Sequence, residues 1–369
     1  MKVLALHLPQ FHAIPENDAW WGEGFTEWDN VRKATPLFTG HKQPVVPLNN
    51  NYYDLSKKED ISWQCKLARQ YLVDGFIYYH YWFNGKLLLE KPCEILRNSP
   101  EIDISYCFCW ANEPWARTWD GKPGSVLMPQ TFGGEADWIA HIKYLEHFFV
   151  DKRYLKVGNM PMLYVYSPCQ IPEFDQMVKL WNEHVKALGF DGIYLVEFIS
   201  TKNPDAFSAY SQAVIEFEPL YTTRFGISNF NKAKRLFDKK LGLTDFQSFN
   251  LLWEAILSRS RTYGERAIQK SGFCGWDNSP RKGKASMIVK GSSPATFKGY
   301  FSRLVNEKRS HCNNDFIVIN AWNEWGEGAM LEPTESNGYG YLEAIRSVVS
   351  EYAAQPSEPS NVSVHVDRH

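Results

Sequence analysis

The sequence predicts a single (β/α)8 TIM barrel with long loops after its strands. Eight apolar runs, rich in β-branched and aromatic residues and bounded by turn residues, recur along the chain. Amphipathic stretches of helical period separate most of them, and strands that alternate with helices build parallel sheets. Eight such units predict a closed barrel. No Gly-x-Gly-x-x-Gly motif follows the first run, which disfavours a dinucleotide-binding fold.

The order of these elements predicts one catalytic domain, residues 1–354, followed by a flexible tail, residues 355–369, that is rich in Pro and Ser. The expected strands cover residues 2–9, 75–83, 104–110, 161–167, 192–199, 213–218, 272–276 and 316–322. The expected helices cover residues 57–72, 135–149, 173–188, 294–308 and 340–352, with a short one at 204–210.

Two connections are unusually long, which in a compact domain indicates function or hidden helices. Residues 10–51 are rich in Trp, Pro and Asn and are suited to the barrel rim. Residues 220–271 carry a basic cluster, which is either a solvated face or an anion site. The cluster consists of Lys232, Lys234, Arg235, Lys239 and Lys240.

Composition excludes several classes of function. A net charge of −2 over 369 residues argues against a nucleic-acid partner. Ten histidines form no His-x-His or His-Glu-x-x-His pattern, so we expect neither a metal nor another cofactor. Seven cysteines without a Cys-x-x-Cys pair predict buried free thiols in a reducing compartment. No apolar run is long enough to span a membrane and residues 2–9 suit a first strand rather than a signal peptide, so we expect a cytoplasmic protein.

Polar and aromatic residues follow the expected strands at the end where barrel enzymes place their active sites. The 14 Trp and 19 Tyr residues add flat rings that can stack on sugar faces. The sequence therefore predicts an oligosaccharide or polysaccharide substrate. The candidate substrate-binding residues are Gln10, His12, Tyr79, His80, Trp82, Trp110, Asn112, Glu113, Arg117, Glu218, Trp276, Asp277, Arg281, Asn320, Trp322 and Asn323.

Two acids after the last expected strand are the predicted catalytic pair. Glu324 and Glu327 are three residues apart, flanked by Trp322, Trp325 and two glycines. Glycosidic bond cleavage commonly uses two carboxyl groups, one that protonates the leaving oxygen and one that acts as base or nucleophile. Alternatively, one of the acids forms a structural ion pair with Arg117 or Arg281.

Other candidates have structural alternatives beside their functional ones. Glu113 follows an Asn, as in many glycosidases, but Arg117 lies four residues on and can hold it as a structural acid. Glu218 either contacts substrate or forms a salt bridge. His12 and His80 are either hydrogen-bonded wall residues or ligands of sugar hydroxyls. Because side chains alternate along a strand, Tyr79 and Tyr81 face one way and His80 the other.

Five motifs give the chain a resemblance to the WbsX-like family, also described as a glycoside hydrolase family 99-like domain. They are Leu6-His7-Leu8-Pro9-Gln10-Phe11-His12, Trp21-Gly22-Glu23-Gly24-Phe25-Thr26-Glu27-Trp28, Trp110-Ala111-Asn112-Glu113, Trp276-Asp277-Asn278-Ser279-Pro280-Arg281 and Asn323-Glu324-Trp325-Gly326-Glu327-Gly328. The resemblance spans roughly residues 1–350.

The resemblance implies a (β/α)8 endo-α-mannosidase-like enzyme that acts with retention through a 1,2-anhydro sugar. Glu324 would then be the base for the sugar 2-hydroxyl, and Glu327 the general acid and base. This chain has Trp-Gly between its acids, where the hydrolases commonly have Trp-His. Two alternatives stay open: a WbsX-type glycosyltransferase of lipopolysaccharide, O-antigen or capsule biosynthesis, and a non-catalytic glycan-binding barrel.

Overall fold

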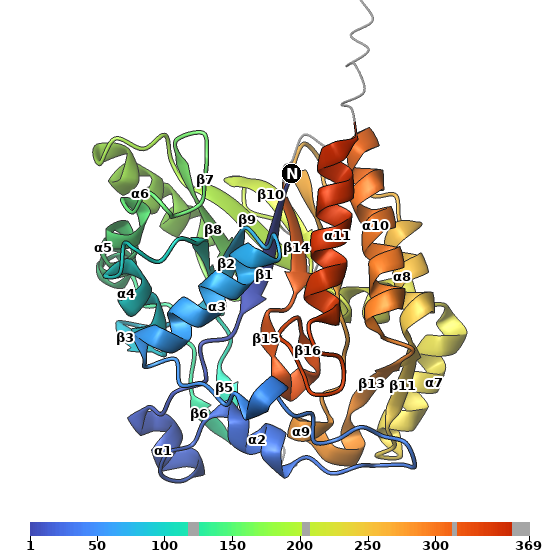
Figure 1. The fold of residues 1–369 in the computed structure, drawn as a ribbon. Coiled ribbons are helices and arrows are strands. Elements are labelled where there is room, and N and C mark those ends of the chain that lie inside the picture. Colours follow the sequence, from blue (N-terminus) through green and yellow to red (C-terminus); the bar gives the residue numbers. More distant parts are fainter. Residues whose placement is uncertain (117–124, 201–206, 312–315, 356–369) are drawn as a thin grey trace, which may run out of the picture.

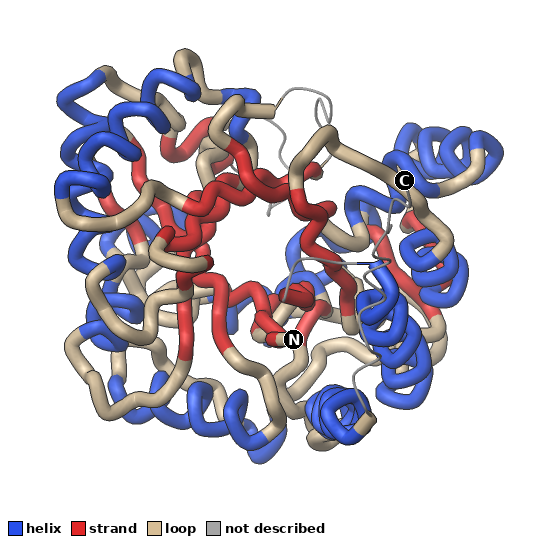
Figure 2. Tube along the Cα trace, turned by 90° about the horizontal axis from the view of Figure 1, so that it is seen from above, coloured by secondary structure: helices blue, strands red, loops and turns tan. Residues whose placement is uncertain are grey.

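Eight parallel strands close into a barrel, as the sequence predicts (Figure 2). The computed structural model describes residues 1–116, 125–200, 207–311 and 316–355. β1 pairs with β14 on one side and β2 on the other, which closes the ring. In barrel order the strands are β1 (Lys2–His7), β2 (Gly75–Phe83), β4 (Ser105–Trp110), β8 (Met160–Val165), β9 (Tyr194–Ile199), β10 (Ser211–Glu216), β12 (Ala267–Phe273) and β14 (Phe316–Asn320).

Helices cover the outside of the barrel (Figures 1 and 2). In α6, the buried residues Met177, Val178, Trp181 and Val185 form the single apolar face that such a helix needs. The expected helices are confirmed except the short one at 204–210: residues 207–210 are not helical, and 201–206 lie outside the described residues. The covering helices are α3 (Lys58–Gln70), α4 (Lys91–Arg97), α5 (Glu135–Phe149), α6 (Phe174–Ala187), α8 (Phe249–Leu257), α10 (Pro294–His311) and α11 (Gly340–Ala354).

The seventh barrel strand differs from its prediction at residues 272–276. β12 begins at Ala267 and ends at Phe273, so Trp276 lies in the loop beyond it. Its middle, Gln269-Lys270-Ser271, is polar and interrupts the apolar signature of a buried strand. Gln269 is nevertheless buried, because its Oε1 accepts a hydrogen bond from the Tyr164 hydroxyl at 2.6 Å. A hydrogen-bonded polar residue inside the barrel therefore concealed this strand from the sequence pattern.

Both long connections contain ordered elements (Figure 1). Residues 10–51 form α1 (Pro15–Trp21), α2 (Glu27–Lys33) and a short turn, η1 (Leu48–Asn50). A capping box starts α2: the Thr26 amide donates to Asp29 Oδ2 at 2.9 Å. Residues 220–271 include the π-helical turn η3 (Thr222–Gly226), α7 (Asn229–Lys240) and β11 (Asp245–Ser248). β11 pairs in parallel with β13 (Met287–Lys290), which ties this insertion to the loop after β12.

The remaining elements are short and lie mainly in the loops around the barrel. They are β3 (Lys86–Leu88), β5 (Trp115–Ala116), β6 (Val126–Met128), β7 (Lys156–Val157), η2 (Pro168–Gln170), α9 (Ser279–Lys282), η4 (Gly283–Ala285), β15 (Asn323–Glu324), η5 (Trp325–Glu327) and β16 (Ala329–Met330). Among the described residues, no helix has the length and apolar character needed to span a bilayer.

The thiols are free, but not all of them are buried. The six cysteines within the described ranges form no disulfide, and five of them are buried. Cys169 is exposed, because it lies in η2, a surface turn, and this corrects the expectation of buried thiols throughout. The predicted tail lies outside the described residues from position 356 onward.

Candidate active site

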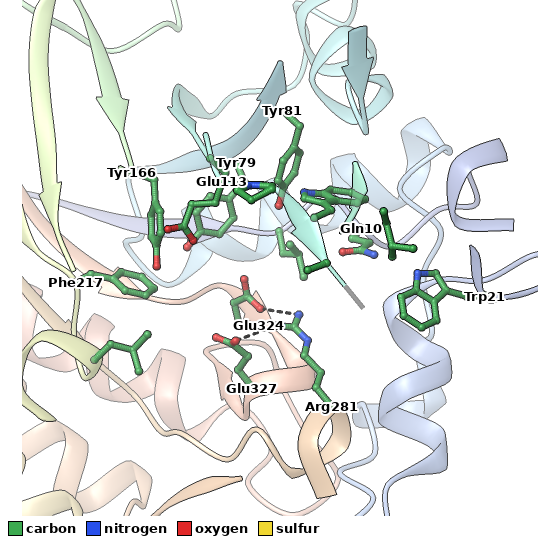
Figure 3. Close-up of a pocket in the computed structure, with 17 residues that line it drawn as sticks. Gln10, Trp21, Tyr79, Tyr81, Glu113, Tyr166, Phe217, Arg281, Glu324 and Glu327 are labelled. Atoms are coloured by element: carbon green, nitrogen blue, oxygen red, sulfur yellow. Dashed lines mark hydrogen bonds and ion pairs between the residues drawn. The ribbon is translucent and has the colours of Figure 1, made fainter. Parts of the chain in front are cut away.

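A cavity of about 280 Å³ opens among the loops that follow the barrel strands (Figure 3). Its wall combines aromatic rings with three acids and one arginine, a composition suited to a sugar ring with its apolar faces and hydroxyl edges. The lining residues are Leu8, Gln10, Trp21, Tyr79, Tyr81, Ala111, Glu113, Pro114, Trp115, Ala116, Leu127, Tyr166, Phe217, Leu220, Arg281, Glu324 and Glu327.

The two predicted catalytic acids lie side by side in this cavity, on a tight loop after β14. Glu324 ends β15, which pairs with β16, and Glu327 ends the single turn η5. Gly328 closes the turn with a φ of 62°, a left-handed conformation that favours glycine. Because the loop is a hairpin and not a regular helix, both carboxylates can point at the same guanidinium.

Arg281 holds both acids. Its Nη2 lies 3.1 Å from Glu324 Oε2 and its Nη1 lies 2.9 Å from Glu327 Oε1 (Figure 3). Its Nε contacts a third carboxylate, Glu27 Oε1, at 2.8 Å. The ion pair that the sequence left as an alternative therefore exists, but it joins the two acids in the cavity and does not remove either of them from it.

Glu27 is fully buried at the start of α2, behind the loop that carries Glu324 and Glu327. Three carboxylates around one guanidinium carry a net negative charge when all are ionised, so the site favours keeping a proton. Burial raises the pKa of Glu27, against the opposing effect of Arg281. Burial also raises the pKa of Glu324; Arg281 opposes this shift, and the charges of Glu327 and Glu27 add to it.

Three tyrosines and a further acid form the wall opposite Glu324 and Glu327 (Figure 3). Burial raises the pKa of Tyr79, Tyr81 and Tyr166, so their hydroxyl groups are neutral and can donate hydrogen bonds to a ligand. Glu113 Oε1 accepts hydrogen bonds from Ser167 Oγ at 2.9 Å and from Gln170 Nε2 at 3.1 Å. Gln10 adds a buried amide whose Nε2 has no partner within the described structure.

Buried hydrogen bonds fix the loop that carries Glu324 and Glu327 to the barrel. Asn323 clamps the backbone of Leu8: its Oδ1 accepts from the Leu8 amide at 2.7 Å and its Nδ2 donates to the Leu8 carbonyl at 2.9 Å. Glu332 accepts hydrogen bonds from Trp325 Nε1 at 2.6 Å, from the Tyr53 hydroxyl at 2.9 Å and from Gln64 Nε2 at 2.8 Å. These contacts hold the residues on either side of Glu324.

Several predicted substrate ligands lie outside the cavity, on the outer face of the barrel strands. His80 Nε2 contacts His141 Nε2 on α5 at 2.9 Å. Trp82 stacks on the His141 ring at 4.6 Å and donates to Asp137. Trp110 is buried and donates to the Trp82 carbonyl at 3.3 Å. The alternation of side chains along β2 therefore places His80 and Trp82 on the face opposite to Tyr79 and Tyr81.

Other predicted ligands are engaged by the protein itself. Asn112 exchanges two hydrogen bonds with the Ser167 backbone, at 2.7 and 2.8 Å, and His12 Nδ1 donates to the Pro9 carbonyl at 3.0 Å. Asp277 accepts hydrogen bonds from His41 at 2.7 Å and Gln43 at 2.8 Å.

The last group surrounds the strand ends at β10 and β14. Glu218 is buried and pairs with Arg259 at 2.9 Å, and Asn320 Nδ2 donates to the Glu218 carbonyl at 2.9 Å. Trp276 and Trp322 are buried outside the cavity lining. Arg117 lies outside the described residues.

Sequence reasoning missed Tyr81, Tyr166, Trp21, Trp115 and Glu27. The period-2 rule that puts Tyr81 on the same face as Tyr79 could have identified it. Trp21 on α1 and Glu27 on α2 belong to one of the five family motifs, but no local pattern links these two helices to a loop some 300 residues later. Within the described residues, no three His, Cys, Asp or Glu side chains gather into a metal site.

A family model described as "Glycosyltransferase WbsX" matches residues 3–345. This chain belongs to the WbsX family. The WbsX relative WxcX of Xanthomonas campestris pv. campestris, described as an uncharacterized protein, is 35% identical over 352 residues. The match covers 94% of this chain and 49% of WxcX, so this WbsX chain spans about half the length of that relative.

Two solved structures share the fold of this WbsX family member. The GH99 endo-alpha-mannosidase from Bacteroides thetaiotaomicron has a TM-score of 0.56 over 95% of this chain and 97% of its own, at 13% identity. A glycoside hydrolase-like protein has a TM-score of 0.59 over 94% and 93%, at 12% identity. At such identities the likeness establishes a common barrel.

Proposed function

We propose that this WbsX family member is a retaining, endo-acting glycoside hydrolase, similar to endo-α-mannosidases, that cleaves a bacterial polysaccharide or O-antigen-type glycan. The observation that carries the proposal is the placement of Glu324 and Glu327 on two terminal nitrogens of one arginine in an aromatic cavity. Two carboxyl groups within reach of one sugar ring are the minimum equipment for glycosidic bond cleavage.

In the first step, the Glu324 carboxylate removes the proton from the sugar 2-hydroxyl. The 2-oxygen then forms a bond to C1 as the bond from C1 to the leaving oxygen breaks. Protonated Glu327 gives its proton to that oxygen, and the product is a 1,2-anhydro sugar. In the second step, Glu327 takes a proton from water, which attacks C1. The bond from C1 to the 2-oxygen breaks, and Glu324 returns the proton to this oxygen. The two inversions at C1 give net retention.

The environments of the two acids suit these roles. A carboxylate is a weak base for a sugar hydroxyl, and the burial that raises the pKa of Glu324 strengthens it as a proton acceptor. Although Arg281 opposes the rise, burial and the neighbouring carboxylates raise the pKa of Glu324 to about 8, so the ionised form that acts as the base gains population as the pH rises towards and above that value. Glu327 is the more exposed acid, with 22% of its side chain accessible against 7% for Glu324, which suits exchange of protons with water.

The test is a pair of isosteric substitutions assayed against polysaccharide. Glu324→Gln and Glu327→Gln should each lower turnover by roughly 10²- to 10⁴-fold while ligand binding persists. Glu254→Gln, which removes an exposed partner of Arg303, is the matched control and should keep full activity. NMR of the newly released sugar should show an unchanged anomeric configuration. Full turnover in both catalytic variants would refute the proposal, and so would an inverted product.

The family description, "Glycosyltransferase WbsX", favours one alternative, a glycosyltransferase. The family resemblance would place such an enzyme in lipopolysaccharide, O-antigen or capsule biosynthesis. The same cavity could then pass a glycan to a sugar acceptor or take a sugar from an activated donor. Incubation with a panel of nucleotide sugars and, separately, with polysaccharide distinguishes the two activities. Consumption of a nucleotide sugar would support the glycosyltransferase, and consumption of polysaccharide alone would support the hydrolase. A non-catalytic glycan-binding barrel would consume neither, and both Gln variants would bind glycan as the natural protein does.

A further inference from the structure

A second cavity, of about 690 Å³, lies beside the catalytic one and is rich in basic side chains. Four cationic residues, Arg224, Lys232, Arg235 and Lys282, line it together with one acid, Asp245. They come from η3, α7, α9 and β11, elements that the chain brings together through the pairing of β11 with β13. We call this hollow the basic cavity.

One of the four cations has a structural role. Arg235 Nε contacts Asp245 Oδ2 at 2.6 Å, and its Nη1 donates to the Thr223 carbonyl. Arg235 therefore joins α7, η3 and β11, and the acid that it engages is neutralised. Within the described part of the chain, Arg224, Lys232 and Lys282 make no ion pair. Three positive charges from three separate elements thus face one hollow without a counter-charge from the described residues.

The basic cavity borders the catalytic one at two points. Leu220 lines both cavities. Arg281 and Lys282 are consecutive residues of α9 whose Cα atoms are therefore about 3.8 Å apart, and Arg281 lines the catalytic cavity while Lys282 lines the basic one. A glycan that contacts Arg281 can therefore reach the basic cavity by passing over Leu220.

We propose that the basic cavity binds an anionic substituent, a carboxylate or a phosphate, of the glycan whose backbone occupies the catalytic cavity. This inference rests on the proposed function and specifies its substrate as an acidic glycan. The chain as a whole has a net charge of −2, so a concentration of cations in one hollow is a local feature and not a consequence of composition. Like charges that face a common space repel one another, and a bound anion replaces this repulsion with attraction to each cation.

The sequence left the basic residues of 220–271 as either a solvated face or an anion site. Lys232 and Arg235 line a cavity, whereas the basic residues of a solvated helix face need only contact water. This observation favours the anion site. Lys282 and Arg224 join them from elements outside α7, so the site is built by tertiary structure.

The experiment measures binding of trigalacturonate and of inorganic pyrophosphate by calorimetry at low ionic strength. The Glu327→Gln protein is used, so that turnover does not interfere. Lys232→Met/Lys282→Met should raise the Kd of at least one probe by roughly 3- to 30-fold, the scale expected for two partly exposed ion pairs. Lys143→Met/Lys179→Met removes the same charge from exposed positions on α5 and α6 and should leave the Kd unchanged.

Each probe reports on one source of the anion. A loss confined to trigalacturonate supports the carboxylate, and a loss confined to pyrophosphate supports the phosphate. Binding should also weaken as ionic strength rises, because added salt screens exposed charges. The proposal is overturned if the Glu327→Gln protein binds neither probe, or if the two double variants weaken binding equally. Because binding is measured without turnover, an inactive enzyme would contradict the proposed function and leave this result standing.

Discussion

The carboxylate of Glu27 occupies the space into which a side chain at position 326 would project. A Cβ added to Gly326 would overlap Glu27 Oε1 and would lie 2.7 Å from Arg281 Nε. Glu27 and Arg281 are themselves joined at 2.8 Å. Gly326, which stands between the two predicted catalytic acids, therefore leaves room for the buried ion pair of Glu27 and Arg281 behind the loop.

Gly326→Ala should destabilise the protein by about 1–3 kcal/mol, the usual cost of forcing extra atoms into a packed site. Turnover should fall as well, because Arg281 must shift and it holds both acids. Urea denaturation and steady-state kinetics measure the two effects. Gly299→Ala is the matched control: Gly299 is exposed within α10 with open space around its Cβ position, so alanine there should stabilise by up to about 1 kcal/mol. Equal effects of the two substitutions would contradict the overlap.

Glu27→Gln should shift the acidic limb of the kcat/KM profile to lower pH. The negative charge of Glu27 raises the pKa of Glu324, and its removal also leaves Arg281 with fewer carboxylates to neutralise it, so both changes favour ionised Glu324. Because the base acts when ionised, activity should persist to lower pH than in the natural protein. A limb that stays in place would show that Glu324 does not set it.

The same substitution should cost about 1–3 kcal/mol of stability, since it weakens a buried charged hydrogen bond. Asp103→Asn provides the comparison, because Asp103 pairs with Arg69 while 82% of its side chain is exposed. That change should alter the free energy of unfolding by less than about 1 kcal/mol.

Adjacent residues of β2 should separate activity from stability. Tyr79→Phe and Tyr81→Phe remove hydroxyl groups that face the cavity, and each should lower kcat/KM by about 5- to 50-fold if it donates one hydrogen bond to substrate, with little loss of stability. His80→Phe removes the hydrogen-bond partner of His141 Nε2 and should lower the free energy of unfolding by about 1–3 kcal/mol, while kcat/KM of the folded protein is unchanged. Reduced kcat/KM in His80→Phe would contradict its placement on the outer face.

Four buried histidines should make the fold sensitive to mild acid. Burial lowers the pKa of His7 and His80 to about 3 and that of His12 to about 4, and it lowers the pKa of His141 well below its ordinary value. The unfolded chain binds protons at these positions below about pH 6.5, whereas the folded chain stays neutral. Their contribution is therefore fully present above pH 6.5 and is lost as the pH falls towards the folded values.

Each such histidine should lower the free energy of unfolding by about 1.4 kcal/mol for every pH unit below 6.5. Urea denaturation at several pH values between 7.5 and 5 measures this slope. His12→Asn can keep the hydrogen bond to the Pro9 carbonyl through its amide. The substitution should reduce the slope of the free energy of unfolding against pH by the contribution of one titrating group. An identical slope in this variant would show that His12 does not contribute.

Local pattern was sufficient to predict the barrel and to single out the loop that carries Glu324 and Glu327. Seven of the eight strands follow from apolar runs of the right length, because a parallel strand buried on both faces needs an uninterrupted apolar surface. β12 is the exception, since polar residues interrupt its apolar run. The pair Glu324 and Glu327 stood out because acids directly after such a run do not stabilise a core. Gln10, Tyr79, Glu113 and Arg281 were placed near them by one rule, that the strands of a barrel end on the same rim.

Tertiary structure decided which face of each strand end the side chains occupy and which distant elements meet there. His80, Trp82 and Trp110 lie near the rim in sequence but pack against α5 and α6, since consecutive side chains point to opposite faces of a strand. Glu27 reaches Arg281 across more than 250 residues, and Lys282 meets Lys232 in a cavity that neither segment forms alone. The sequence determines the periodicity of apolar and polar residues within each strand and helix. Contacts between distant segments depend on which loops the closed barrel brings together at its rim.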